Sequence, residues 1–141
     1  MLKTLLMLLS ATFALGVRAA SDNEVHLTLI ETSDVHGNFF PYDFLAGGKP
    51  GSGSLARAAT YIDSLRLARG DDSVILLDNG DILQGQPTAY YYNFIDTTAT
   101  HLCADVLNHM RYDAVTVGNH DIEAGHDVHD RWARQCRMPV L

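Results

Sequence analysis

The chain has 141 residues, of which 47% are hydrophobic and 19% are charged, a composition typical of one globular domain. Seventeen acidic residues outnumber ten basic ones and give a formal net charge of −7. Such a chain lacks the basic face that a nucleic acid backbone requires, so a nucleic acid duplex is excluded as a partner. A small phosphate ester is not excluded, because a local cluster of cations can override the average field.

Residues 1–19 have the layout of a secretory signal peptide. Lys3 precedes an apolar core from Leu5 to Leu15, and small residues lead to a cleavage site after Ala19. This core is too short to cross a membrane, so no transmembrane segment is expected. The sequence therefore predicts an exported protein, found in the periplasm, outside the cell or on the cell surface.

The first half of the remaining chain carries one strand signal and one helix signal. Apolar and polar residues alternate over 24–34, which predicts a strand that ends near Thr32. The glycine-rich segment 45–54 is expected to be a loop. A helix is expected to follow over 54–70, with Ser54 as its N-cap.

The second half of the chain continues the alternation of strand and helix signals. The continuous apolar run at 73–81 predicts a fully buried strand. Residues 98–113 fit a helix, 114–121 a third strand and 123–136 a further helix, while 138–141 begin an expected fourth strand. This order predicts an α/β fold in which helices cover the faces of the sheet.

Two cysteines, Cys103 and Cys136, stand 33 positions apart and match no zinc-finger spacing. In an exported chain they form either one disulfide or a pair of buried free thiols. The sequence favours neither reading, because it does not show whether their Cα atoms approach.

Polar side chains follow each of the three predicted strands. The strand ends read TSDVHG, DNGD and GNHD in chain order. In α/β sheets ligands bind beyond the carboxyl ends of the strands. We therefore expect the three segments to converge on one edge of the sheet, each delivering groups that bind metals.

Asp34 and His36 form the first candidate pair of metal ligands. They lie two positions apart as the first strand ends, so period-two geometry places both side chains on the same side. An oxygen and an imidazole nitrogen suit Mn, Fe or Zn more than Ca. Taken alone, this pair is better explained as an aspartate turn with a surface histidine.

Asp81 is the second candidate ligand, at the end of the second strand. A carboxylate has two oxygens, so one aspartate can bridge two cations about 3.5–4 Å apart. Gly80 and Gly85 bracket a tight loop suited to holding Asp81 rigidly. Taken alone, the segment also fits an ordinary Asn-Gly turn with Asp78 as its cap.

The third segment offers Asn119 as a metal ligand without charge and His120 as a group facing the substrate. His120 is able to protonate a leaving alkoxide or to hold a phosphoryl oxygen. Asp121 or Glu123 is expected to fix the tautomer of that ring. A hydrogen-bonded loop explains this segment alone, but the succession of all three segments is improbable by chance.

The set TSDVHG, NGDILQG and GNHD resembles the calcineurin-like metallophosphoesterases, which carry D-x-H, G-D-x-x and G-N-H-[DE] in that order. Further stretches, DVHGNFFPYDF, GSLARAATYI and GNHDIEAG, resemble the secreted 5′-nucleotidase and 2′,3′-cyclic-nucleotide phosphodiesterase branch. The likeness runs from about Val25 to Leu141. It implies a four-layer αββα sandwich, of which this chain supplies the N-terminal portion.

Two divalent metal ions, Zn, Mn or Fe, are the cofactors that the resemblance implies. Asp34, His36 and a bridging Asp81 would hold the first ion, and Asp81 with Asn119 would hold the second. The ions lower the pKa of a bridging water from about 15.7 toward 7 and so supply hydroxide at neutral pH.

His120 is the catalytic histidine that the resemblance implies, with Glu123, three residues later, as its partner acid. Asp121 is the weaker candidate for that partner. The implied function is metal-dependent hydrolysis of phosphate esters, with nucleotides as the expected substrates. The enzyme would be a 5′-nucleotidase or a 2′,3′-cyclic-nucleotide phosphodiesterase. A small nucleotide or other phosphate ester is then the partner.

The chain departs from the family pattern in its later histidines. The family completes its metal shells with a downstream Gly-His and a Gly-His-x-His, whereas Gly125-His126 comes too early to match. The domain that grips the nucleoside is also not found before Leu141. Residues 20–141 are therefore expected to be the N-terminal part of a longer metallophosphoesterase. Two alternatives follow: a module that binds metal or nucleotide without turnover, and a same-fold enzyme for another ester.

Overall fold

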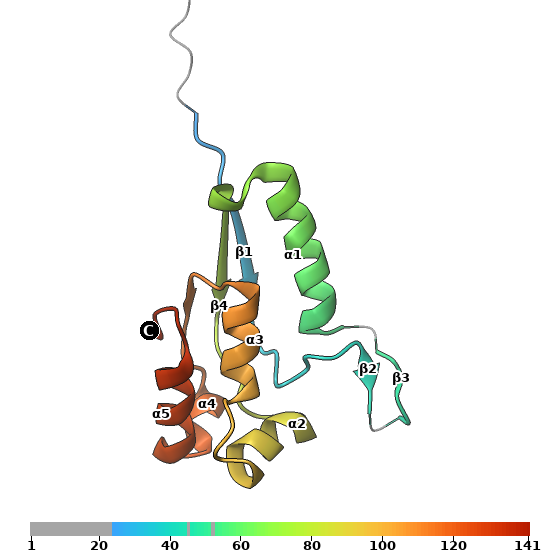
Figure 1. Cartoon of the computed structure of the whole chain (residues 1–141), viewed down its shortest axis with the longest axis vertical. Coiled ribbons are helices and arrows are strands. Elements are labelled where there is room, and N and C mark those ends of the chain that lie inside the picture. The colour runs from blue at the N-terminus through green and yellow to red at the C-terminus, as the bar shows by residue number, and fades with distance from the viewer. Residues whose placement is uncertain (1–23, 45, 52) are drawn as a thin grey trace, which may run out of the picture.

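The computed structural model describes residues 24–44, 46–51 and 53–141, and Figure 1 draws the rest as a thin grey trace. The predicted signal peptide, residues 1–19, lies outside the described residues. Within the described ranges, every helix is too short or too polar to cross a membrane.

Helices separate the three long-range strand segments β1, β4 and β5 along the chain, as the sequence predicts. The strands are β1 (Thr28–Thr32), β2 (Tyr42–Asp43), β3 (Lys49–Pro50), β4 (Val74–Asp78) and β5 (Ala114–Val115). The helices are α1 (Leu55–Arg69), the 3-10 helix η1 (Asp71–Ser73), α2 (Pro87–Tyr90), the π-helix η2 (Tyr91–Ile95), α3 (Leu102–Met110), α4 (Asn119–Glu123) and α5 (His126–Gln135).

Three parallel strands in the order β1-β4-β5 form the sheet, which confirms the predicted α/β class. Thr32 faces Asp78 and Asp78 faces Val115, so the three strands end at one edge. The predicted convergence of the three polar segments is therefore confirmed. The expected fourth strand is reduced to one parallel bridge, between Val115 and Val140.

Helices α1, α3 and α5 pack against one face of this sheet, with α3 between the other two (Figure 1). Leu76, Leu107 and Trp132 are fully buried between them. The prediction that the second strand is buried on both faces is wrong, because Leu77 on its other face is only half-buried. Leu29 of β1, on that same other face, is 65% exposed. The apolar run of β4 therefore has its packing partners on one side within the described part of the chain.

Helix α1 begins and ends where the sequence predicts. The Ser54 hydroxyl accepts the N–H of Arg57, and Gly70 follows the last turn with a positive φ of 89°. Arg66 is buried despite its charge and donates to the carbonyls of Met110 and Arg111. This guanidinium satisfies the open carbonyl end of α3 and ties the two helices together.

Two helices begin later than predicted. Helix α3 starts at Leu102 instead of 98, because the Asp96 carboxylate accepts the N–H groups of Thr98 and Ala99 and holds that stretch in a turn. Helix α5 starts at His126 instead of 123, because residues up to Glu123 belong to α4.

The third strand is shorter than predicted. β5 ends at Val115, and the Thr116 N–H extends the ladder by one bond to Asp78. Gly118 then caps α4, where its N–H donates to the Asp121 carboxylate at 2.9 Å. The prediction that Asn119 ends a strand is therefore wrong, since this residue opens a one-turn helix.

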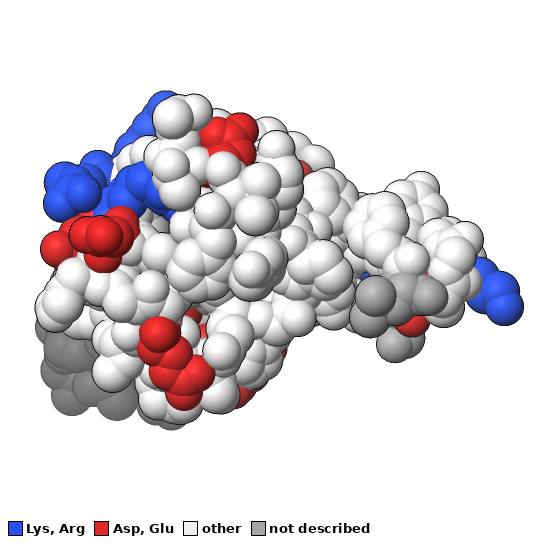
Figure 2. Space-filling view, turned by 90° about the horizontal axis from the view of Figure 1, so that it is seen from below, with Lys and Arg blue, Asp and Glu red and all other residues white. Residues whose placement is uncertain are grey.

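The surface at the carboxyl ends of the strands carries few charges in its middle. These ends point down in Figure 1, and Figure 2 looks at the molecule from that side, where acidic and basic side chains gather mostly toward one end. Cys103 is buried, Cys136 is half-buried, and both are free thiols. Of the two readings of the cysteines, the structure contains the free pair.

Candidate metal centre and active site

The first polar segment turns sharply as it leaves β1. Asp34 and His36 both have positive φ angles, of 53° and 51°. The Asp34 N–H donates to the Gly80 carbonyl at 3.1 Å. The His36 N–H donates to the Asp81 carbonyl at 2.8 Å, so the first segment is fixed against the second. The prediction that strand geometry aligns Asp34 with His36 is wrong, because β1 has already ended and two left-handed residues align them.

Three side chains from these two segments gather within reach of one ion. Ligand atoms of Asp34, His36 and Asp81 all lie within 4.8 Å of one another. His36 Nδ1 is 3.0 Å from the Gln84 carbonyl, which can only accept, so Nδ1 is the donor and Nε2 is the ring nitrogen that could bind an ion. Two carboxylates and one neutral imidazole fit a divalent transition metal ion.

Asp81 is held in a strained backbone conformation by its neighbours. It is buried with a φ of 60°, and its Oδ1 accepts the His120 N–H at 2.8 Å. Four residues later, a Cβ at Gly85 would lie 2.6 Å from the His36 carbonyl oxygen. Only glycine allows the second segment to pass this close to the first.

Asn119, the expected ligand of a second ion, is exposed at the start of α4. Its amide lies within hydrogen-bonding reach of Glu123 and lowers the pKa of that carboxyl, after larger contributions from His120 and Gln84. Asp81 is the other residue expected at the second ion. The described residues thus bring together three side chains that could hold one ion, and the second position with Asp81 and Asn119 stays a prediction.

His120 and Glu123 form a pair one turn apart on α4. His120 Nδ1 is 3.0 Å from Glu123 Oε2. The hydrogen bond to Glu123 raises the pKa of His120, and the same bond lowers the pKa of Glu123. The ring centroids of His36 and His120 are 5.3 Å apart. The expected catalytic histidine and its expected acid therefore stand beside the three metal-competent side chains.

Asp121 is turned away from the His120 ring and is fully buried. Its two oxygens accept four backbone N–H groups, at 2.7–2.9 Å. The donors are Asp81, Ile82, Leu83 and Gly118. Asp121, the weaker candidate for holding His120, therefore supports the backbone of the second segment instead. Its position in the sequence does not reveal this role.

Asp121→Asn is expected to destabilise the fold by about 3 kcal/mol, because an amide NH₂ replaces one oxygen and faces two backbone donors that lose their acceptor. The free energy of unfolding in urea measures this loss. Asp127→Asn, an exposed carboxylate in the first turn of α5, is the matched control and should stay within about 0.5 kcal/mol. Equal stabilities of the two variants would contradict this role of Asp121.

Asp78 anchors the start of the second segment. Its Oδ1 accepts the Gly80 N–H at 3.0 Å and its Oδ2 accepts the Thr32 hydroxyl at 2.5 Å. Burial raises the pKa of this carboxyl. The capped Asn-Gly turn that the sequence offered as an alternative is therefore present, and it coexists with Asp81 among the metal-competent side chains.

Asn93 supports the second segment from its carbonyl side. Its Nδ2 donates to the Leu83 carbonyl at 2.7 Å, and its Oδ1 lies 2.8 Å from His101 Nε2. His101 Nδ1 accepts the Cys103 N–H at 3.2 Å, so Nε2 carries the proton of this neutral ring. Asp121 thus binds the N–H groups of the backbone at 81–83, and Asn93 binds a carbonyl of the same stretch.

His101 is expected to make the fold less stable as the pH falls. Burial, with a smaller contribution from Arg131, lowers its pKa from 6.5 to about 4. Between these values the unfolded chain binds the extra proton, so stability is complete above pH 6.5 and declines toward pH 4 by up to about 3 kcal/mol. His101→Asn retains a helix-capping oxygen without a titrating ring. Urea unfolding at several pH values should show a shallower decline in this variant, and an identical decline would contradict the assignment.

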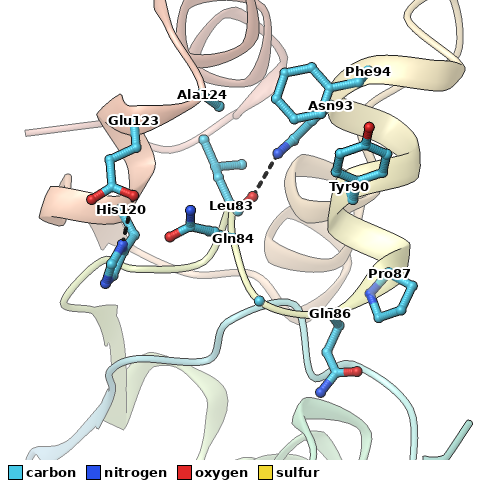
Figure 3. Close-up of a pocket in the computed structure, with 11 residues that line it drawn as sticks. Leu83, Gln84, Gln86, Pro87, Tyr90, Asn93, Phe94, His120, Glu123 and Ala124 are labelled. Atoms are coloured by element: carbon cyan, nitrogen blue, oxygen red, sulfur yellow. Dashed lines mark hydrogen bonds and ion pairs between the residues drawn. The ribbon is translucent and has the colours of Figure 1, made fainter. Parts of the chain in front are cut away.

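A cavity of about 620 Å³ opens beside His120 and Glu123. Figure 3 shows α4 on one side of it, Tyr90 and Phe94 on the other, and Leu83 with Gln84 between them. Sequence reasoning missed this wall, which α2 and η2 form. Pro87 at the first position of α2 is the signal that identifies a helix start here.

Comparison with known proteins gives relatives that are much longer than this chain. The trifunctional nucleotide phosphoesterase protein YfkN of Bacillus subtilis (strain 168) is 33% identical over 124 residues, which are 84% of this chain and 8% of that protein. The 2′,3′-cyclic-nucleotide 2′-phosphodiesterase/3′-nucleotidase of Haemophilus influenzae is 30% identical over 87% of this chain and 19% of its own length. The chain therefore spans less than a fifth of either relative.

The solved structure that shares this fold is also longer than this chain. The crystal structure of calcineurin-like phosphoesterase YfkN from Bacillus subtilis superposes with a TM-score of 0.74 and 33% identity, over 83% of this chain and 36% of that one. A family model described as calcineurin-like phosphoesterase matches residues 27–139, which include all three polar segments. The chain therefore belongs to the calcineurin-like phosphoesterase family.

Proposed function

We propose that the protein containing this chain hydrolyses phosphate esters of nucleotides with the help of divalent metal ions. The observation that carries the proposal is the gathering of Asp34, His36 and Asp81 beside the His120–Glu123 pair. Family membership and relatives named as nucleotide phosphoesterases support the same reaction class.

The three ligands have separate tasks. Asp34 and Asp81 supply negative charge and His36 supplies Nε2, the nitrogen left free by the bond from Nδ1 to Gln84. Bound divalent ions supply positive charge for the phosphate and make a water molecule acidic enough to act as the nucleophile at neutral pH. The rigid support of Asp81 keeps these groups in place without substrate.

His120 acts on the substrate from beside the metal ligands, with its ring centroid 5.3 Å from that of His36. The hydrogen bond from Nδ1 to Glu123 raises the pKa of the His120 ring, which favours the imidazolium form with its second proton on Nε2. This proton is donated to the leaving oxygen, or held on a phosphoryl oxygen as its charge grows. Hydrolysis of a monoester then releases phosphate and an alcohol, whereas a 2′,3′-cyclic ester opens to a nucleotide monoester.

The signal-like segment 1–19 supports export, and we propose a location in the periplasm, outside the cell or on its surface. The number of ions and the identity of the metal, Zn, Mn or Fe, belong to the proposal. Three gathered ligands are enough for one ion, and the second expected position has Asp81 and Asn119 from this chain.

The complete protein should hydrolyse nucleotides only while its metals are bound. Removal of metal with EDTA is expected to abolish phosphate release, and Mn²⁺ or Zn²⁺ added after dialysis should restore it. Phosphate release from 5′-nucleotides and 3′-nucleotides, and chromatography of the monoester formed from 2′,3′-cyclic nucleotides, measure this. Activity that survives metal removal would refute the metal dependence. Binding of metal and nucleotide without any turnover would favour the binding module instead.

A further inference from the structure

The proposed chemistry gives no role to the side chain of Gln84, although this residue contacts both halves of the candidate active site. Its main-chain carbonyl accepts the hydrogen bond from His36 Nδ1 at 3.0 Å. Its side chain hydrogen-bonds Glu123, the acid that holds His120. Figure 3 shows the Gln84 side chain directed toward Glu123 and His120. One residue therefore contacts a metal-competent side chain with its backbone and the partner acid of His120 with its amide.

The backbone that leads to Gln84 is held firmly in place. The Asp121 carboxylate accepts the N–H of Leu83 at 2.8 Å, and Asn93 donates to the carbonyl of Leu83 at 2.7 Å. Asp121 belongs to α4, the same helix that carries Glu123. The second segment and α4 are thus joined twice, once at the buried Asp121 and once near the surface, where Gln84 meets Glu123. Two separate links fix the helix against the segment more firmly than one link would.

The Gln84 amide is the donor in its contact with Glu123, because an ionised carboxylate only accepts hydrogen bonds. This bond lowers the pKa of Glu123, after the larger contribution from His120 and ahead of a smaller one from Asn119. In the proposed metal centre the Asn119 amide binds an ion instead. Gln84 is then the neutral side chain that remains to hold Glu123.

We propose that Gln84 is a positioning residue, whose side chain keeps Glu123 on His120 while its carbonyl keeps His36 turned toward the metal. Its effect on turnover rests on the proposed function. An uncharged amide suits this role, since a Lys or Arg in its place would form an ion pair with Glu123 and compete with His120 for the carboxylate. Gln84 acts through Glu123 and His36 and takes no part in bond cleavage.

Gln84→Met removes the amide, keeps the length of the side chain and leaves the main-chain carbonyl in place. In the complete protein it should lower kcat for nucleotide hydrolysis by about three- to tenfold, the range of one hydrogen bond, with KM unchanged. The Mn²⁺ affinity in equilibrium dialysis should stay within about twofold, because the carbonyl still holds His36. Gln86→Met is the matched control and should change none of these values, since the Gln86 side chain on the same loop points away from Glu123 (Figure 3). A higher KM with kcat unchanged would make Gln84 a substrate contact and overturn the positioning role.

A double-mutant cycle tests whether Gln84 acts through Glu123. Glu123→Ala should lower kcat, and Gln84→Met added to it should lower kcat further by less than about twofold. A side chain that only stabilises the loop would reduce turnover equally in both backgrounds. Additive losses would therefore overturn the link between Gln84 and Glu123.

Nitrogen NMR of the histidine-labelled, metal-free complete protein tests the link without turnover, with His120 assigned from the signal that His120→Ala removes. Gln84→Met should shift the Nδ1 resonance of His120, because the Glu123 carboxylate that accepts from it is held less firmly, and Gln86→Met should not. A protein that hydrolyses no nucleotide but shows this shift keeps the positioning role and refutes the proposed function. A protein that hydrolyses nucleotides while Gln84→Met changes neither the resonance nor kcat overturns the positioning role alone. Absence of both hydrolysis and the shift overturns both.

Discussion

His120→Ala in the complete protein is expected to lower kcat for nucleotide hydrolysis by about 10²- to 10⁴-fold, the range that a positioned acid or base contributes. The metal content should not change, because His120 is not one of the three side chains whose ligand atoms gather. Its ring instead faces His36 at 5.3 Å and pairs with Glu123. Steady-state kinetics and metal analysis on the same preparation measure both quantities.

His109→Ala is the matched control for this variant, since His109 is an exposed histidine near the end of α3. It should retain full turnover. Near-normal activity of His120→Ala would remove His120 from the mechanism. Loss of metal together with activity would instead make His120 a ligand.

Asp81→Asn is expected to lose metal. The carboxylate of Asp81 is the ligand shared by both proposed positions, and an amide keeps the shape while removing the charge. Substitution of a group that only orients a ligand costs about 10- to 100-fold in affinity, so loss of a ligand itself should exceed that range. Mass-spectrometric metal analysis after equilibrium dialysis against Mn²⁺ measures the loss.

Asp105→Asn, an exposed carboxylate in the first turn of α3, controls for the change in net charge and should bind metal normally. The fold of Asp81→Asn should be checked by urea unfolding, because Asp81 Oδ1 also accepts the His120 N–H. Undiminished occupancy in a folded Asp81→Asn protein would refute the bridging role.

The arrangement of the sheet followed from the sequence because hydrophobic runs and caps carry that information locally. The segment 54–70 shows its helix through Ser54 and a terminal glycine, and the structure confirms both. Parallel strands joined by helices must end on one side of the sheet, so the meeting of Asp34, Asp81 and His120 was predictable in outline.

The local geometry of the site was not predictable in the same way. Asp34, His36 and Asp81 all have positive φ angles, which are rare for residues other than glycine and carry no periodic signal. Helix α4 replaces the end of the third strand because Asp121 caps it, a contact that depends on the fold around the second segment. A tetrapeptide alone does not distinguish these outcomes.

Side chains that support the site by hydrogen bonds to main-chain groups were the hardest to predict. Asp121 and Asn93 hold the second segment through bonds to main-chain groups 10 to 40 positions away. The cavity wall from Tyr90 and Phe94 depends on two short helices that lack the length for a periodic pattern. Long-range contacts of this kind appear only when the chain is folded.

A crystal structure of the complete protein grown with Mn²⁺, with an anomalous difference map, tests the metal centre most directly. The predicted result is a peak bonded to the carboxylates of Asp34 and Asp81 and to His36 Nε2, at about 2.0–2.2 Å. A protein that binds Mn²⁺ but shows its peaks away from these three side chains would contradict the assignment of this edge of the sheet as the catalytic centre.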